Sequence, residues 1–337
     1  MNLTFIIGNG FDLKLGMKTR YTDVYESYIK SKSKSETIEK FKANLESDYE
    51  KWSDFEIGMA KYARNFNSED ELIECVRDFR SHMTEQLSRE NDIIKKKIYD
   101  YNDIIEILDE TKRSLYSFYE GLIPNAKYEI KQLMNKTPTT INFIVFNYTQ
   151  TLDQILYSCA RTGYQTGNKP IHIHGELGND VALGVDDVAQ LEYPPYNITK
   201  RGKRTFVKPL YNLDFDKQRV DAAANVISKS DIICVYGFAF GETDETWVKS
   251  IADWLRSSPE KQLVVFQYDE KVYNINNRDE LMDVEDDKRN ELLKRLGFNS
   301  LEYDKVEGQV HIPIGADIFN YGFLTKSDAD SKELVQA

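Results

Sequence analysis

The fold is decided by residues 3–12 near the N-terminus, Leu3-Thr4-Phe5-Ile6-Ile7-Gly8-Asn9-Gly10-Phe11-Asp12. The first five residues are an apolar run of β-favouring side chains, which predicts a buried strand. Two glycines follow and predict a sharp turn into a helix, whose N-terminus could accept a phosphate. Position 13, where the dinucleotide fingerprint needs glycine, is leucine, so a conventional hydride-transfer enzyme is disfavoured.

Four later apolar runs predict further buried strands, at 141–146, 171–174, 231–236 and 262–266. Helical patterns lie between most of them, at 149–161, 219–228 and 246–256. Strands that alternate with helices predict an α/β fold with a doubly wound, mostly parallel sheet. The proline-containing stretch 190–213 predicts a long loop or a small lid.

Residues 22–136 show apolar spacings of three and four and no clear strand pattern, which predicts amphipathic helices. The chain of 337 residues is also longer than one compact core usually organises. We therefore predict a nucleotide-binding α/β core formed by 1–21 and 137–325, a helical insertion domain at 22–136 after the first strand, and a flexible C-terminal tail at 326–337.

Charge and composition narrow the classes of function. The formal net charge of -12 argues against non-specific nucleic-acid binding, although the basic stretch 200–204 could form a local patch. The three cysteines have no zinc spacing and fit a reducing compartment. We find neither a signal peptide nor an apolar stretch long enough to span a bilayer, so we expect a cytoplasmic protein without a membrane partner.

Three polar motifs follow the predicted strands, where ligands bind in such sheets. Asn147 follows the second strand, His174 ends the third, and Gly237-Phe238 follows the fourth. Histidine is the natural base near neutral pH. Each motif also has a structural explanation, since Thr149 and Asp244 could simply cap the next helices and the aromatic side chain could join the core.

A metal site is the alternative for the histidines. His172 and His174 alternate on one predicted strand, and Asp180, Asp186 and Asp187 follow as further oxygen ligands. No second cluster of ligands supports this site, so we expect no metal.

Six motifs occur in a characteristic order, I-I-G-N-G-F-D (6–12), W-S-D-F-E (52–56), F-N-Y-T-Q-T-L (146–152), H-I-H-G-E-L (172–177), L-G-V-D-D (183–187) and Y-G-F-A-F-G-E-T-D (236–244). Together they resemble the AbiH family of bacteriophage abortive-infection proteins over nearly the whole chain. The resemblance implies a role in phage defence.

The same motifs are more distantly similar to sirtuin-like NAD-binding domains, which implies a sirtuin-like or Rossmann-like core. By that likeness Asn147 takes the place of the sugar-binding asparagine and His174 that of the base. The residues expected to bind the nucleotide are Gly8, Asn9, Gly10, Phe11, Asp12, Thr149, Gly175, Gly237, Phe238 and Asp244. Asp12 stands where sirtuins commonly have serine, and no four-cysteine zinc module is present, which argues against protein deacylation.

Three hypotheses for the function follow, the first two from the resemblances and the third from His172, His174 and the nearby aspartates. The first is hydrolysis of NAD+ at the nicotinamide–ribose bond, with His174 and Asn147 as catalytic residues and NAD depletion as the outcome. The second is a non-catalytic sensor that binds NAD or a related nucleotide. The third is a metal-dependent nuclease or phosphoesterase. A defence enzyme must be restrained before infection, so we expect a homo-oligomer, a phage-derived trigger or a partner defence protein.

Overall fold

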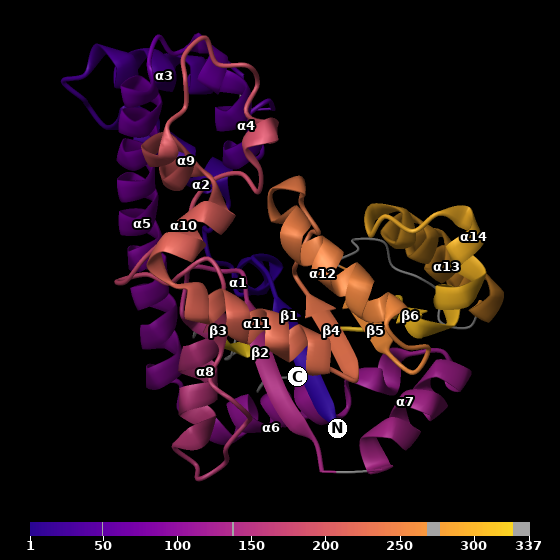
Figure 1. Ribbon diagram of the computed structural model, residues 1–337. Helices are drawn as coiled ribbons and strands as arrows, with labels where there is room; N and C mark the ends of the chain where they lie inside the picture. The colour runs from indigo at the N-terminus through magenta and orange to yellow at the C-terminus, as the bar shows by residue number, and fades with distance from the viewer. Residues whose placement is uncertain (49, 137, 268–276, 326–337) are drawn as a thin grey trace.

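The computed structural model describes residues 1–48, 50–136, 138–267 and 277–325. Within these residues six strands form one parallel sheet in the order β3-β2-β1-β4-β5-β6 (Figure 1). The strands are β1 (Asn2–Ile7), β2 (Thr140–Val145), β3 (Ile171–His172), β4 (Ile232–Tyr236), β5 (Gln262–Phe266) and β6 (Val310–His311). The α/β class and the parallel sheet predicted from the sequence are confirmed.

The helices between the strands are numbered along the chain. Those before β2 are α1 (Gly10–Lys14), α2 (Tyr21–Lys30), α3 (Glu36–Ser47), α4 (Phe55–Tyr62), α5 (Glu69–Asp100), α6 (Ile104–Tyr116) and α7 (Pro124–Lys136). Those after β2 are α8 (Thr151–Ala160), α9 (Lys200–Phe206), α10 (Lys208–Phe215), α11 (Lys217–Lys229), α12 (Glu245–Arg256), α13 (Arg278–Arg295) and α14 (Ser300–Val306). Short 3₁₀ segments include η3 (Val188–Gln190) and η4 (Glu242–Asp244).

Both faces of the sheet are covered, because the strands alternate their side chains between two hydrophobic cores. In β1, Phe5 and Ile7 pack in the core formed with α6, α7 and α8, whereas Ile6 packs in the core formed with α11 and α12. The same alternation holds in β4, where Cys234 belongs to the first core and Val235 to the second. This two-sided burial explains why the strands are continuous apolar runs in the sequence.

A third hydrophobic core lies away from the sheet, in the tower of helices α2, α3, α4 and the first part of α5 (Figure 1). Ile94 and Ile98 in the second part of α5 pack in the sheet core instead, as do residues of α6 and α7. The helices of 22–136 therefore contribute to two cores. The domain boundaries stay a prediction, but the cores place a natural division within α5 rather than at residue 136.

The structure differs from the sequence prediction in three places. The third strand covers Ile171–His172 only, so His174 lies in an irregular turn and not on a strand. The predicted loop at 190–213 contains α9 and the start of α10, since Thr199 caps α9 and Pro209 stands in the first turn of α10, where proline is tolerated. The short strand β6 was not predicted. The predicted tail at 326–337 lies outside the described residues.

Two further expectations concern the cysteines and membranes. Cys75, Cys159 and Cys234 are buried and have free thiols. None of the helices in the described ranges is both long and apolar enough to cross a membrane.

Candidate functional site

The turns after β1 and β4 pack backbone against backbone at the point where the strand order reverses. A Cβ atom at Gly8 would lie 2.5 Å from the carbonyl oxygen of Gly237, so an alanine does not fit there. The amides of Gly8 and Gly10 donate to the carbonyl oxygens of Tyr236 and Gly237, both at 2.9 Å. These two amides are therefore occupied by the fold, and this close approach accounts for the glycines of the predicted phosphate turn.

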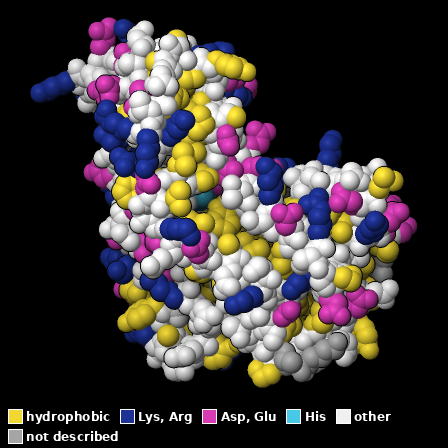
Figure 2. Space-filling view, in the orientation of Figure 1, with side chains coloured by type: hydrophobic (Ala, Val, Ile, Leu, Met, Phe, Trp, Pro, Cys, Tyr) yellow, Lys and Arg dark blue, Asp and Glu magenta, His cyan; other side chains and the backbone are white. Residues whose placement is uncertain are grey.

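A cavity of about 250 Å³ lies above these turns, at the carboxyl ends of the strands. Ligands bind at this edge in open parallel sheets. Its other wall comes from the tower, through Tyr21, Asp54, Glu56, Met83 and Leu87. Figure 2 shows the recess between the tower and the body that contains the sheet, with apolar side chains and a histidine visible at its floor.

Most of the residues predicted to bind the nucleotide line this cavity. They are Gly8, Asn9, Asp12, Asn147, Thr149, His174, Gly237, Phe238 and Asp244. Gly10, Phe11 and Gly175 do not line it. Phe11 points into the sheet core, where its ring packs against Tyr236 and Phe319. Gly175 has a positive φ of 83° and forms the turn after His174.

Asp12 is a fully buried carboxyl group on one side of the cavity. It does not cap α1; Thr149 donates its hydroxyl proton to Asp12 Oδ2 at 2.5 Å, and Oδ1 has no hydrogen-bond partner among the described residues. Burial raises the pKa of Asp12 to about 6, although hydrogen bonds from Thr149, Thr151 and Asn147 favour the carboxylate. Asp12 can therefore gain or lose a proton close to neutral pH.

The loop that carries Asn147 is fixed by His172. The His172 ring lies with Nδ1 3.1 Å from the backbone oxygen of Asn147 and Nε2 2.8 Å from Asp153 Oδ2. Burial opposes a charge on this ring, but the bond and charge of Asp153 raise the pKa of His172. Both ring nitrogens face acceptors, so the imidazolium form suits the site. The Asn147 Oδ1 atom stays buried, with no partner within the described ranges.

His174 lines the cavity, and its pKa shifts in the opposite direction to that of His172. Its Nε2 atom is 2.7 Å from Asp244 Oδ1, and the Nδ1 atom is buried without a partner in the described part of the chain. Burial and the charge of Lys208 lower the pKa of His174, despite Asp244. A neutral ring donates Nε2–H to Asp244, which leaves the lone pair of Nδ1 free as a base.

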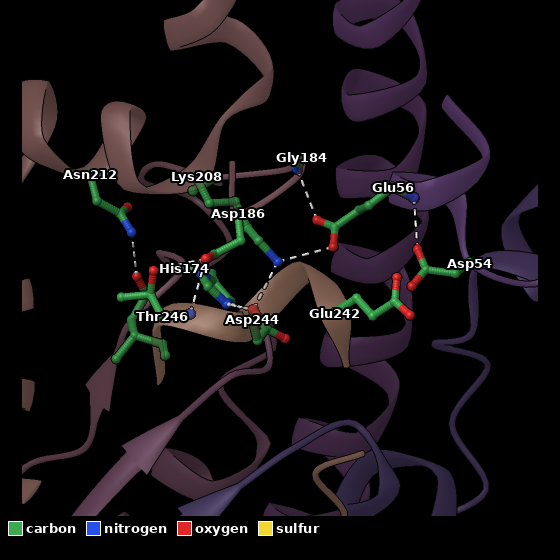
Figure 3. Close-up of polar contacts among 12 residues, drawn as sticks. Asp54, Glu56, His174, Gly184, Asp186, Lys208, Asn212, Glu242, Asp244 and Thr246 are labelled. Atoms are coloured by element: carbon green, nitrogen blue, oxygen red, sulfur yellow. Dashed lines mark hydrogen bonds and ion pairs between the residues drawn. The ribbon is translucent and has the colours of Figure 1, made fainter. Parts of the chain in front are cut away.

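Lys208 and Glu56 extend this contact into a buried chain of charges (Figure 3). Lys208 Nζ lies 2.8 Å from Asp244 Oδ1 and 3.0 Å from Glu56 Oε2, and Glu56 Oε1 accepts from the amide of Gly184 at 2.8 Å. The sequence analysis missed both residues. Glu56 stands in the W-S-D-F-E motif, which was recognised but not placed, and nothing in the sequence singles out Lys208.

Two aromatic rings border the cavity beside His174. Phe146 and Phe238 lie with ring centroids 4.1 Å apart, and Phe146 also meets the His174 ring edge to face at 5.4 Å. Phe238 is only partly buried. These rings give the cavity an apolar wall next to the unpartnered nitrogen.

The residues considered for a metal site each bind a different partner. His172 binds Asp153 and His174 binds Asp244, while Asp180 forms a two-point ion pair with Arg219. Asp186 accepts from Thr246, and Asp187 caps η3. Within the described ranges no group of three or more histidine, cysteine, aspartate or glutamate side chains is placed to hold a metal ion.

The chain matches one protein family over most of its length. Residues 4–289 match the model of a family described as bacteriophage abortive infection AbiH. The match includes β1 from Thr4 onward, the whole of β2 to β5 and all the residues of the cavity. No curated protein matches the chain.

Proposed function

The chain belongs to the AbiH family of bacteriophage abortive-infection proteins, and from this premise we propose that it hydrolyses NAD+ at the nicotinamide–ribose bond during phage defence. The family implies abortive-infection defence; the reaction is our proposal. Depletion of NAD+ would stop the metabolism of an infected cell and so end phage growth.

The observation that carries the proposal is the state of His174. His174 lines the cavity, and its neutral ring, with Nε2–H held by Asp244, keeps a buried Nδ1 that has no partner among the described residues. A general base must be unprotonated at working pH and within reach of the proton that it removes. His174 meets the first condition because its pKa is lowered by burial and by Lys208.

The proposed reaction needs one base and a polar cradle for the sugar. The C–N bond between ribose and nicotinamide breaks, and its electron pair leaves with the nicotinamide nitrogen, which becomes neutral. Water attacks the sugar carbon and gives its proton to His174 Nδ1. Asn147 and Asp12, each with a buried unpartnered oxygen, would bind ribose hydroxyl groups.

The size of the cavity indicates which part of NAD+ it would hold. Its volume of about 250 Å³ is below the roughly 300–1,000 Å³ usual for ligand sites. We place the nicotinamide and its ribose in the cavity, against Phe146 and Phe238. The remainder of the dinucleotide would lie outside, or the tower would have to move to admit it.

The test is nicotinamide release from NAD+ by the purified protein, alone and in extract of phage-infected cells. We expect His174→Ala and Asn147→Ala each to lower turnover by about 10²–10⁴-fold while the fold is kept. His82→Ala is the matched control, since His82 lies on α5 outside the cavity and bonds Ser27.

Two results would contradict the proposal. If NAD+ raises the melting temperature of the protein but no nicotinamide forms in either condition, the site is that of a non-catalytic sensor. If activity on nucleic acid or phosphoesters appears and disappears with a chelator, the metal-dependent alternative replaces it.

A further inference from the structure

The buried chain of charges joins three separate parts of the fold. Glu56 comes from α4 of the tower, Lys208 is the first residue of α10, and Asp244 ends η4 after β4. Figure 3 shows their side chains converging beside His174. The side chains of Lys208 and Glu56 are only 3% and 5% exposed, so their charges are almost completely removed from water.

A buried ammonium group is stable only where carboxylates compensate its charge. Lys208 has two, at 2.8 Å and 3.0 Å. Burial opposes the charge on Lys208, but Asp244 and Glu56 together raise its pKa, so it stays protonated. Two carboxylates near one cation cannot both keep a low pKa. Burial opposes ionisation of Asp244, but the charge of Lys208 and the hydrogen bonds from His174 and Lys208 outweigh it and lower the pKa of Asp244, so Asp244 remains the stronger acid.

The pKa of Glu56 shifts in the opposite direction to the pKa of Asp244. Burial raises the pKa of Glu56 to about 7, the charges of Asp54 and Asp244 add to this effect, and Lys208 acts against it. Asp244 therefore stays ionised, and its carboxylate accepts the hydrogen bond from His174 Nε2–H.

The other charged groups around the cluster come from four further elements. Arg219 of α11 also lowers the pKa of His174, and Tyr148 after β2 faces Lys208. Asp186, before η3, faces Lys208 and Asp244, while Arg80 of α5 faces Glu56. Lys208 differs from these four groups because it bonds Asp244 Oδ1, the same oxygen that His174 bonds.

Resting on the proposed function, we propose that Lys208 is a positioning residue of the reaction and that Glu56, supplied by the tower, is the counter-charge that keeps it in the site. Lys208 holds Asp244 ionised and His174 neutral, with Nδ1 free. The base at the end of the sheet therefore depends on a contact with the helices between β1 and β2.

The first readout is the titration of the His174 ring by nitrogen NMR on histidine-labelled protein. The chain has four histidines, so His174→Ala assigns the signal. In Lys208→Met the ring loses its cationic neighbour and keeps Asp244, so its titration midpoint should rise by about one pH unit or more. Lys208→Arg keeps the charge and should titrate close to the unmodified protein.

Lys208→Met leaves the buried Glu56 without a cation beside it and could unfold the protein, so the double variant Glu56→Gln/Lys208→Met is the decisive one. It removes both charges, should be more stable than Lys208→Met alone, and should still show the raised titration. In the second readout, nicotinamide release at a pH below both midpoints should fall about tenfold in the double variant and recover at higher pH. Arginine at position 208 should restore the original pH profile.

The inference is overturned if His174 in the double variant titrates at or below its midpoint in the unmodified protein. It is also overturned if the double variant is no more stable than Lys208→Met, because Glu56 would then not be the counter-charge. Failure of the proposed function is distinguishable: no protein, including the unmodified one, would release nicotinamide, while the NMR titration would still report on Lys208.

Discussion

Replacement of Asp12 by asparagine should stabilise the protein at neutral pH and leave its stability almost unchanged in acid. The carboxyl group is fully buried, and its pKa is raised to about 6 from an ordinary value of 3.8. Asparagine has nearly the same shape and can accept the hydroxyl proton of Thr149, but it carries no charge to bury.

The magnitude follows from linkage between protonation and folding. The unfolded chain loses this proton near pH 3.8 and the folded protein near pH 6, so between these values the folded state binds more protons. The free energy of unfolding therefore falls as pH rises through this window. At about 1.36 kcal/mol per pH unit the full cost approaches 3 kcal/mol above pH 6, and Asp12→Asn should recover up to about that amount.

Urea denaturation of both proteins at pH 4.5 and pH 8 measures the effect. We expect a stability difference at pH 8 that falls to about one third of that value at pH 4.5. Asp92→Asn, at an exposed position of α5, controls for loss of a surface charge. A difference that is equal at both pH values, or a destabilised variant at pH 8, would refute the reasoning about burial.

Three further substitutions test other parts of the site. Gly8→Ala should destabilise the protein by about 1–3 kcal/mol, because the new Cβ would lie 2.5 Å from a carbonyl oxygen in the turn after β4. Thr149→Val should cost about 1–3 kcal/mol, since it removes the hydroxyl that bonds Asp12. His172→Gln should destabilise most below pH 6.5 and progressively less as pH rises, because Asp153 raises the pKa of His172 in the folded state and this contribution is lost as the ring deprotonates. Urea denaturation across pH measures all three.

Each of these substitutions has its own contradicting result. A fully stable Gly8→Ala would mean that the two turns can separate without cost. Thr149→Ser keeps the hydroxyl, so it should be milder than Thr149→Val; equal losses would remove the role of the hydrogen bond. A pH-independent effect of His172→Gln would show that the ring is neutral in the folded protein.

The sequence was informative where the fold repeats a simple period. β1, β2, β4 and β5 are apolar runs because both faces of the sheet are covered, and the turns that follow β1, β2 and β4 are marked by glycine or asparagine. The convergence of Asp12, Asn147 and His174 at one cavity follows from the parallel sheet, since the carboxyl ends of its strands share an edge.

The parts that escaped prediction depend on long-range contacts. β6 pairs through two residues only, too few for a pattern. Pro209 suggested a loop, yet proline fits the first turn of a helix. Lys208 and Glu56 become a pair only through the paths of α10 and α4, and an isolated lysine or glutamate in a sequence is far more often a surface residue.

The central place of β1 in the sheet has a consequence for synthesis. Ile7 is flanked by Val145 and Tyr236, so β1 leaves the ribosome well before either of its two partner strands. At about 5–20 residues per second, the second partner emerges roughly 10–50 s after the first strand. A nascent chain that stops before Tyr236 lacks one wall of the cavity, the turn that packs on Gly8, and Asp244. Fragments from translation interrupted before Tyr236 therefore carry no assembled site.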